Sequence, residues 1–399
     1  MLKITPTLIL LVLGCLACTL AQKPLQHYYA PNAGLPSAEE FKNYFEEWHK
    51  SYRGPGIDKT ADREAWFMKR LTDIIRHNQN PHRTFNRTVN RFTGRYLSEL
   101  AGTTVMYPQN CLVTTDQIKP STGRAGSSGF HFSWRDKSVV NPIKDQKQCG
   151  ASYAFAAAAA IESHWGIRTG VPPALTSEQQ PIDCSLNYNN SGCEGGLPQL
   201  TYQYLQDTSG LSTENTYPFE AQIGQCRFRN RNVFARVYNG SVNIVPGDEL
   251  AIYQALTTFG PISVGLQVSE DFLDYDGGIY QSTECKNDTL IVNHTVTIIG
   301  YGTDDNTRTD YWVAKNSWGT MWGEIGYVRI RRGVNTCGIA NCASYPNINY
   351  TNPITNSSVG DVVVVEDNHF SYLTPIFNWF TQTFDRVRNG VYDYIIQNI

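Results

Sequence analysis

The chain has 399 residues, of which 41% are hydrophobic and 17% are charged. This composition allows a packed globular core and argues against wholesale disorder. The formal net charge of −3 gives no electrostatic reason to expect a nucleic-acid partner.

The first 21 residues have the pattern of a secretory signal peptide, and we assign residues 1–21 to it. Lys3 supplies the positive charge, residues 8–13 form an apolar run, and Thr19-Leu20-Ala21 offers a cleavage site. The run is too short to span a bilayer, and no later segment reaches about 18 uncharged apolar residues. We therefore expect a secreted, extracellular or lysosomal protein for which a membrane surface is not a partner.

The cysteine content agrees with an oxidising compartment. Of the 10 cysteines, Cys15 and Cys18 would leave with the signal peptide. The remaining even set predicts disulfides, although the sequence alone allows about 105 pairings. Only Cys15 and Cys18 have a C-x-x-C spacing, and no H-E-x-x-H is present, so we expect neither a metal nor another cofactor.

The rest of the chain divides into four parts. Residues 38–105 carry apolar residues at helical spacing, among them Trp48, Phe67 and Ile74, and predict a helical block. Residues 120–129 have the small residues of a linker. Residues 130–346 are rich in glycine, aromatics and β-branched runs and predict the main domain. Residues 347–399 form an extension, in which Thr374-Pro375 begins a predicted amphipathic helix that packs on its own chain or on a protein partner.

Within the main domain, residues 154–169 predict a helix because their alanine run has the highest helix propensity and Gly170 is a good C-terminal stop. Ser152 then lies at or just before the helix start, where free backbone N–H groups favour developing negative charge. Taken alone, the position of Ser152 favours a simple helix cap.

Flanking motifs favour a chemical role for Ser152. Residues 149–153 are C-G-A-S-Y and resemble the C-G-[SA]-C-[WY] segment of papain-like peptidases, with serine in the position of the nucleophilic cysteine. His294 follows Ser152 by 142 residues, inside that family's window of about 130–150 residues. The Asn316-Ser317-Trp318-Gly319 motif comes after it, and residues 192–196 resemble the family's glycine wall.

The resemblance is closest to the cathepsin L-like branch and covers roughly residues 40–346. It implies an α+β, papain-like two-lobed fold, with a helical left lobe and a β-barrel-like right lobe, preceded by a helical inhibitory pro-region. It also implies three disulfides, which pair Cys149 with Cys193, Cys184 with Cys226, and Cys285 with Cys337. Cys111 and Cys342 are left over; we hypothesise that they pair, with two independent thiols as the alternative.

The same resemblance assigns residues 38–105 to the pro-region, which we expect to dock on the main domain. Departures from the family pattern are Lys59 and Arg70, which replace the usual Glu and Asn, and Gly94, which replaces the usual Asp. The usual pH-sensitive release of the pro-region is therefore an open question for this chain.

The resemblance also implies roles for the site residues. Ser152 would attack an amide carbonyl, His294 would transfer the proton and Asn316 would orient His294. Gln146 and the backbone N–H of residue 152 would stabilise the oxyanion, and Trp318 would pack over Asn316. Substrate-binding positions would be Gly195, Gly196, Leu197, Asn293 and Trp318. A glycan on the Asn293 sequon would obstruct the cleft, unless that side chain is too buried to be modified.

With serine at residue 152, we expect very low peptidase activity. A cysteine beside an imidazolium can stand as a thiolate, whereas a serine hydroxyl is far less acidic. Oxygen is also smaller than sulfur, and a misplacement of about 1 Å can cost on the order of 100-fold in rate. We therefore predict a catalytically impaired pseudo-peptidase that still binds peptides, its own pro-region or inhibitors.

Two alternatives remain. One is a working Ser-His-Asn hydrolase or condensation catalyst, since the segment C-G-A-S-Y-A-F is similar to that of silicateins. The other is a structural protein of the extracellular matrix. Oligomeric state is not predicted.

Overall fold

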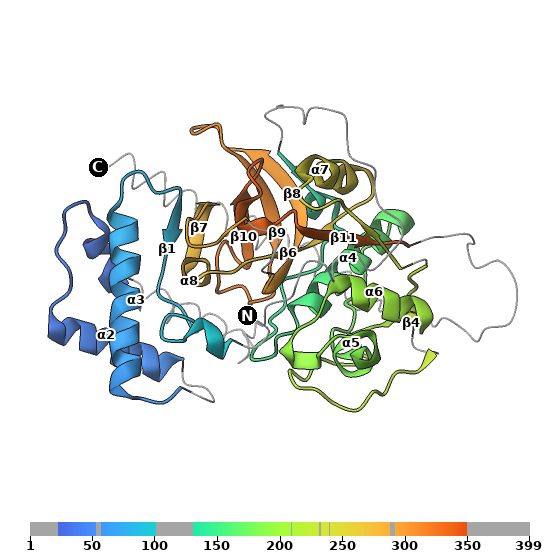
Figure 1. The fold of residues 1–399 in the computed structure, drawn as a ribbon, viewed down its shortest axis with the longest axis horizontal. Coiled ribbons are helices and arrows are strands. Elements are labelled where there is room, and N and C mark those ends of the chain that lie inside the picture. The colour runs from blue at the N-terminus through green and yellow to red at the C-terminus, as the bar shows by residue number, and fades with distance from the viewer. Residues whose placement is uncertain are drawn as a thin grey trace, which may run out of the picture. The chain divides into compact units, whose positions relative to one another are not determined.

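The structure is a computed structural model, and it describes residues 23–52, 57–100, 131–208, 210–230, 233–238, 240–287 and 292–348. These residues belong to one compact unit. The predicted signal peptide, the linker and the extension with its amphipathic helix lie outside the described residues. The α+β, two-lobed architecture that the resemblance implied is confirmed (Figure 1).

The described residues 23–100 form the N-terminal segment. It contains the 3-10 helix Lys23–Tyr29, helix α2 (Ala38–Ser51), helix α3 (Ala61–Gln79) and strand β1 (Phe85–Arg87). Ser37 and Glu40 cap α2 reciprocally, and Thr60 caps α3, which satisfies backbone N–H groups at both helix starts. Leu25 packs in the same apolar core as Trp48 and Phe67, so the folded segment begins upstream of residue 38.

The helical lobe of the main domain (described residues 131–348) is built around helix α4 (Ser152–Thr169). Gly170 ends α4 in the left-handed conformation with φ 71°, as the sequence predicted. Helices α5 (Gln179–Cys184) and α6 (Pro198–Asp207) and the short strands β3 (Leu211–Ser212) and β4 (Val233–Ala235) complete this lobe. Most of α4 is buried, which explains why its sequence is apolar all round rather than amphipathic.

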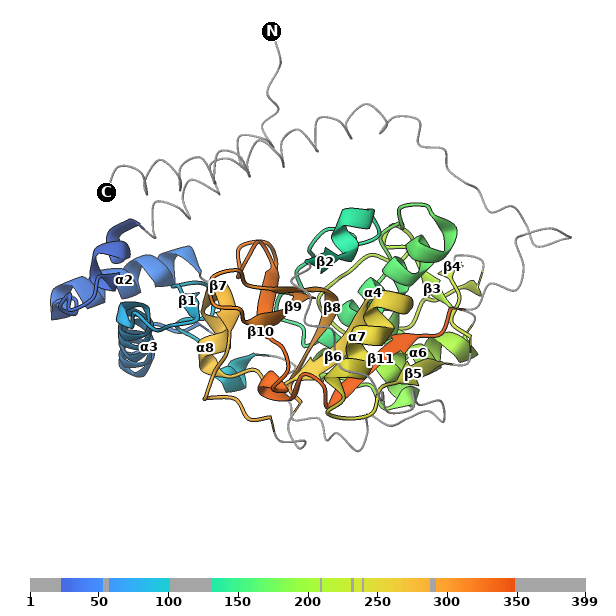
Figure 2. The same cartoon turned by 90° about the horizontal axis from the view of Figure 1, so that it is seen from above.

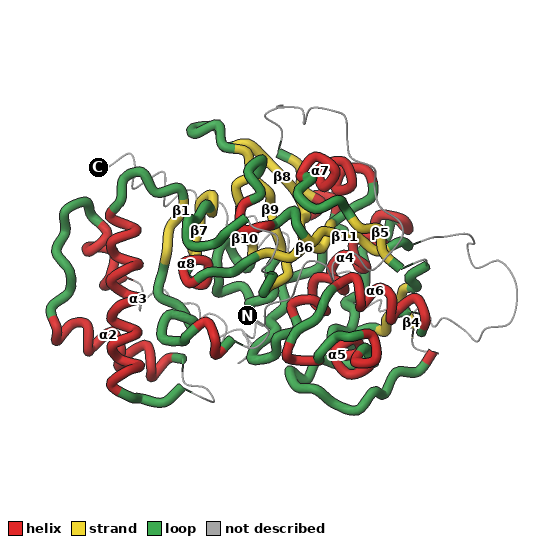
Figure 3. Tube along the Cα trace, viewed as in Figure 1, coloured by secondary structure: helices red, strands yellow, loops and turns green. Residues whose placement is uncertain are grey.

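The sheet lobe holds one sheet in the order β1-β7-β10-β9-β8-β6-β11-β5, with β2 pairing with β8 (Figure 3). Its strands in the main domain are β2 (Phe132–Ser133), β5 (Ser241–Asn243), β6 (Ile262–Leu266), β7 (Tyr275–Tyr280), β8 (His294–Thr303), β9 (Asp310–Lys315), β10 (Tyr327–Arg331) and β11 (Cys342–Pro346). Helices α7 (Glu249–Thr258) and α8 (Glu270–Leu273) accompany it (Figure 2).

Strand β1 of the N-terminal segment extends this sheet at its edge. It pairs antiparallel with β7, with Phe85 opposite Gly278. Backbone hydrogen bonds beside the ladder join Thr88 N–H to Asp274 O and Ile279 N–H to Thr84 O, each at 2.8 Å. The N-terminal segment is therefore joined to the main domain by backbone pairing as well as by side chains.

The helices of the described residues include none that is long and apolar enough to cross a membrane. In the same residues, no group of three or more His, Cys, Asp or Glu side chains is placed to hold a metal ion.

Candidate active site

Ser152 is the first residue of α4, and it lies against the start of β8. Its Oγ accepts a hydrogen bond from the backbone N–H of Thr295, with 3.2 Å between the two atoms. Thr295 directly follows His294, the first residue of β8. The start of a helix in one lobe and the start of a strand in the other are thereby brought together, which places Ser152 and His294 in one site.

His294 and Asn316 are joined by a hydrogen bond of 2.8 Å between His294 Nε2 and Asn316 Oδ1. The same oxygen accepts the backbone N–H of Ser317 at 2.8 Å. Because an amide oxygen can only accept, Nε2 carries the ring proton and Nδ1 keeps a lone pair. Burial lowers the pKa of His294 to about 4, against the opposing effect of the Asn316 hydrogen bond. The imidazole is therefore neutral at neutral pH.

Gln146 is held close to the start of α4 by both ends of its side-chain amide. Its Nε2 donates to Cys149 O at 2.9 Å, and its Oε1 accepts the Ser317 hydroxyl at 2.6 Å. Its backbone N–H donates to Ser317 O at 2.8 Å. The second Nε2 hydrogen is left over as a donor, because an amide group carries two.

Trp318 packs against the ring of His294, with 4.5 Å between ring centroids. The sequence predicted that Trp318 would pack over Asn316, and this stays a prediction; Trp318 does contact His294, the hydrogen-bond partner of Asn316. On its other side Trp318 meets Phe92 of the N-terminal segment at 4.9 Å. The N-terminal segment thus reaches the layer of side chains that supports His294.

Two of the predicted substrate-binding residues, Gly196 and Leu197, lie in tightly packed surroundings. Gly196 has no room for a side chain, because a Cβ there would lie 2.3 Å from Asn190 Oδ1. Leu197 is buried in an apolar cluster with Leu200, Val292 and Cys342.

Asn293 is only 6% exposed, and its side-chain amide makes two hydrogen bonds with the backbone of Val268. Oδ1 accepts Val268 N–H at 2.6 Å, and Nδ2 donates to Val268 O at 3.0 Å. The nitrogen that a glycan would need is therefore both buried and bonded.

Three disulfides are formed, and they are the pairs that the resemblance implied: Cys149–Cys193, Cys184–Cys226 and Cys285–Cys337. The first ties the segment before Ser152 to the glycine stretch at residues 192–196. Cys342 is also disulfide-bonded. Its predicted partner, Cys111, lies outside the described residues, so that pairing stays a prediction.

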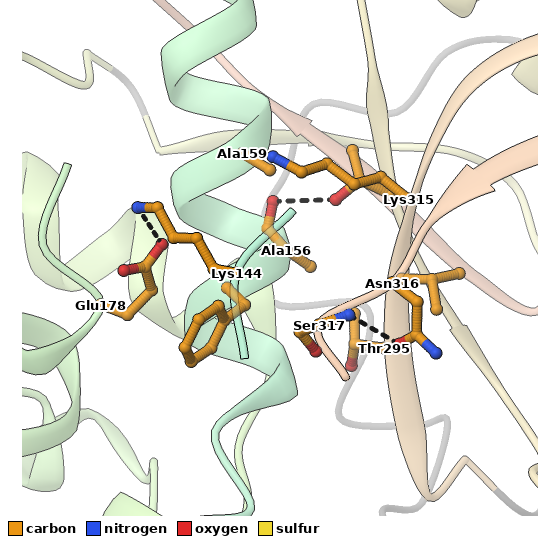
Figure 4. Close-up of a pocket in the computed structure, with 11 residues that line it drawn as sticks. Lys144, Ala156, Ala159, Glu178, Thr295, Lys315, Asn316 and Ser317 are labelled. Atoms are coloured by element: carbon orange, nitrogen blue, oxygen red, sulfur yellow. Dashed lines mark hydrogen bonds and ion pairs between the residues drawn. The ribbon is translucent and has the colours of Figure 1, made fainter. Parts of the chain in front are cut away.

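A pocket lies beside the site, between α4 and the adjoining ends of β8 and β9 (Figure 4). Its lining includes Thr295, Asn316 and Ser317, together with three charged side chains: Lys144, Glu178 and Lys315. Lys144 Nζ forms an ion pair of 2.7 Å with Glu178 and donates to Thr176 O.

The charged groups around this pocket have perturbed acidity. Burial raises the pKa of Glu178 to about 7 and lowers the pKa of Lys315 to about 8. Glu162 of α4 also pairs with Lys144, at 3.3 Å. Sequence reasoning missed this group; the signal was Glu162, an acidic residue that directly follows the apolar run of residues 153–161 in a buried helix.

Fold and site together define a two-lobed protein with a serine, a histidine and an asparagine converging between its lobes. The profile of the papain family cysteine proteases matches residues 129–347, and the chain belongs to that family.

Two of the relatives that the chain resembles are cathepsins or cathepsin-like peptidases. Mouse pro-cathepsin H is 38% identical over 308 residues, covering 77% of this chain and 89% of the relative. A cathepsin L-like peptidase of Aedes aegypti is 39% identical over 326 residues, covering 81% and 90%. Among solved structures, digestive procathepsin L2 from Tenebrio molitor larval midgut has a TM-score of 0.69 and 31% identity, covering 77% of this chain and 100% of that one. The ragweed pollen cysteine protease Amb a 11 in its proform has a TM-score of 0.67 and 27% identity, covering 78% and 94%.

Proposed function

We propose that this protein is a catalytically impaired member of the papain family whose cleft binds peptide or protein ligands. The observation that carries the proposal is the state of the thiols. Every described cysteine is disulfide-bonded, and the residue at the start of α4 beside His294 is Ser152. No described thiol is thus available to attack a substrate in a family of cysteine proteases.

The chemistry of Ser152 supports weak or absent turnover. A standing thiolate needs an imidazolium beside it, whereas His294 is neutral at neutral pH. A serine must instead lose its proton during the attack. Ser152 Oγ accepts a hydrogen bond from Thr295 N–H, and among the described residues no hydrogen bond joins it to His294.

The remaining roles are part of the same proposal. Asn316 positions His294, Gln146 offers an N–H toward a carbonyl oxygen, and Gly195, Gly196 and Leu197 line the cleft. The N-terminal segment is the inhibitory pro-region, with residues 130–346 as the peptidase-like domain. Secretion or a lysosomal destination is supported by the disulfides, because such bonds persist in oxidising compartments.

A serine-type hydrolase is the second candidate, and the tautomer of His294 favours it. Since Asn316 Oδ1 holds the proton on Nε2, the other ring nitrogen has the lone pair that a general base needs. A neutral imidazole is also the correct protonation state for taking a proton from a hydroxyl.

Turnover of a mixed fluorogenic peptide library distinguishes the two. Linker-cut protein from which the N-terminal segment has been separated is compared as wild type, Ser152→Cys and Ser152→Ala, and peptide binding to each is measured by calorimetry. We expect a silent wild type, measurable turnover in Ser152→Cys, and peptide binding by wild type and Ser152→Ala. Wild-type turnover that Ser152→Ala abolishes would establish the serine hydrolase and exclude the pseudo-peptidase.

A further inference from the structure

Three ion pairs between the N-terminal segment and the main domain meet at one short stretch of the main domain, residues 270–274. Arg70 of α3 donates through Nη1 to Glu270 Oε2 at 3.1 Å and through Nη2 to Glu270 O at 2.6 Å. Nη2 also forms an ion pair with Asp274 Oδ2. Arg87 of β1 binds the same carboxylate oxygen at 3.1 Å. Arg70 therefore pairs with both acidic side chains, Glu270 of α8 and Asp274 directly after it, and Arg87 pairs with Asp274.

Three of these four charged side chains are withdrawn from water; Glu270 is the exception, with 33% of its side chain exposed. The side chains of Arg70 and Arg87 are 1% and 5% exposed, and that of Asp274 is 0% exposed. Salt screens such pairs far less than it screens surface pairs. Removing one partner of a buried, hydrogen-bonded charge pair is costly because the other charge stays buried without a counter-ion.

Uncharged side chains of the N-terminal segment donate two further hydrogen bonds to the same stretch. Thr93 Oγ1 donates to Asp274 Oδ1 at 3.3 Å, and Asn90 Nδ2 donates to Leu273 O at 2.8 Å. The end of α8 is therefore enclosed by residues from α3, β1 and the turn after β1.

A third arginine extends the surface toward the active site. Arg91 makes two hydrogen bonds to the Asp145 carboxylate, at 2.6 and 2.9 Å, and a third to Trp318 O at 3.1 Å. Asp145 directly precedes Gln146, and Trp318 packs on His294. The fork of a guanidinium group matches a carboxylate in this two-point manner, whereas an ammonium group does not.

We propose that Asp145, Glu270 and Asp274 form a guanidinium-binding surface on the main domain, which keeps the N-terminal segment bound as a separate subunit after the linker is cut. This deepens the proposed function, because it names the contacts by which the pro-region would stay over the cleft. Arg70, which stands where the family usually has Asn, is the central ligand of this surface. An asparagine side chain is shorter and uncharged, and it could not bind Glu270 and Asp274 together.

The test uses the full chain carrying Cys111→Ser, so that no disulfide from that position can hold the pieces together, and a protease site placed in residues 120–129. After cleavage, dissociation of the N-terminal segment is followed at neutral pH by gel filtration and by dilution of a fluorescently labelled segment. Arg70→Asn is compared with Lys69→Asn, a matched change of charge at a neighbouring position whose side chain is 58% exposed and pairs with Asp73 of its own helix.

We expect the unsubstituted segment and Lys69→Asn to stay bound, and Arg70→Asn to raise the dissociation constant at least about 30-fold. Arg70→Lys should raise it as well, because a lysine cannot bind both acidic side chains and Glu270 O with one planar fork. Equal dissociation constants for Arg70→Asn and Lys69→Asn would overturn the proposal.

Folding of the variant segment is checked separately. If Arg70→Asn disturbs α3 itself, Glu270→Gln on the main domain decides the matter: it should weaken retention, and unchanged retention would overturn the proposal. Hydrogen exchange at Thr88 and Ile279 in the uncut chain should quicken in the same variants. All of these experiments measure binding or hydrogen exchange and none measures turnover. A failure of the guanidinium-binding proposal can therefore be distinguished from a failure of the proposal that Ser152 impairs catalysis.

Discussion

His294 and Asn316 share a hydrogen bond that determines which ring nitrogen of His294 carries the proton. With Nε2–H donated to Asn316 Oδ1, Nδ1 keeps its lone pair, and burial keeps the ring neutral above about pH 5. A neutral ring cannot form an ion pair with residue 152, so the site holds no pre-formed pair of charges.

The acidity of His294 should depend on the residue at position 152. In wild type the imidazole should titrate near pH 4, because its folded-state pKa is depressed by burial. In Ser152→Cys a thiolate would stabilise the imidazolium and raise that pKa. NMR titration of labelled histidines measures both. His164, a buried histidine bonded to Pro261 O with a pKa of about 4, is the internal control and should not respond. A wild-type His294 that is still protonated at pH 6 would contradict this account.

Asn293 should carry no glycan although its sequon is intact. Its Nδ2 is hydrogen-bonded to Val268 O and buried, whereas Asn189 is exposed. Mass spectrometry of protein from a glycosylating host should find residue 293 unmodified, with residue 189 as the comparison site within the same molecule. Asn293→Asp should lower the free energy of unfolding by about 1–3 kcal/mol, because Val268 O loses its donor. Full occupancy at residue 293 would show that the pairing with Val268 is wrong.

Gly94→Ala should destabilise the N-terminal segment. A Cβ at Gly94 would lie 2.3 Å from the ring of Trp48, whose Nε1 donates to Asn90 O. Inserting atoms into a filled core costs roughly 1–3 kcal/mol. Denaturant unfolding of the full chain measures the loss. Gly34→Ala, which meets no atom within 4 Å, is the matched control. Equal stability of the two variants would mean that Trp48 gives way without cost.

The Cys111–Cys342 hypothesis predicts a covalent tether between the two parts of the chain. Cleavage between residues 120 and 129 should leave one band on a non-reducing gel and two bands after reduction. Cys111→Ser should give two bands without reductant. The gel therefore reports only the covalent tether, whereas the guanidinium-binding surface acts under native conditions. Two bands from unsubstituted, non-reduced protein would exclude the pairing.

Local signals explain what the sequence could predict. The start and end of α4 followed from its alanine run and Gly170, and the C-G-A-S-Y segment located Ser152 against His294 and Asn316. Strand β1 could not be predicted from the sequence. Its three residues are too few to show an alternation of apolar and polar side chains, and its partner strand β7 lies far along the chain. Arg70 had the pattern of one more charge on a helix that is rich in charges. Its contacts with Glu270, the first residue of α8, and with Asp274, which follows α8, become visible only in the folded structure.

The extension of the sheet by β1 has a consequence for the protein once the N-terminal segment is gone. Strand β7 then becomes an outer strand, with the N–H of Ile279 and the carbonyl of Asp274 unpaired. Unpaired outer strands recruit other chains, and natural proteins discourage this with charges at the edge. Asp274 and Asp276 lie at that edge, so mutual repulsion between two such edges would favour a monomer over self-association. Loss of these carboxylates would turn the processed protein toward aggregation.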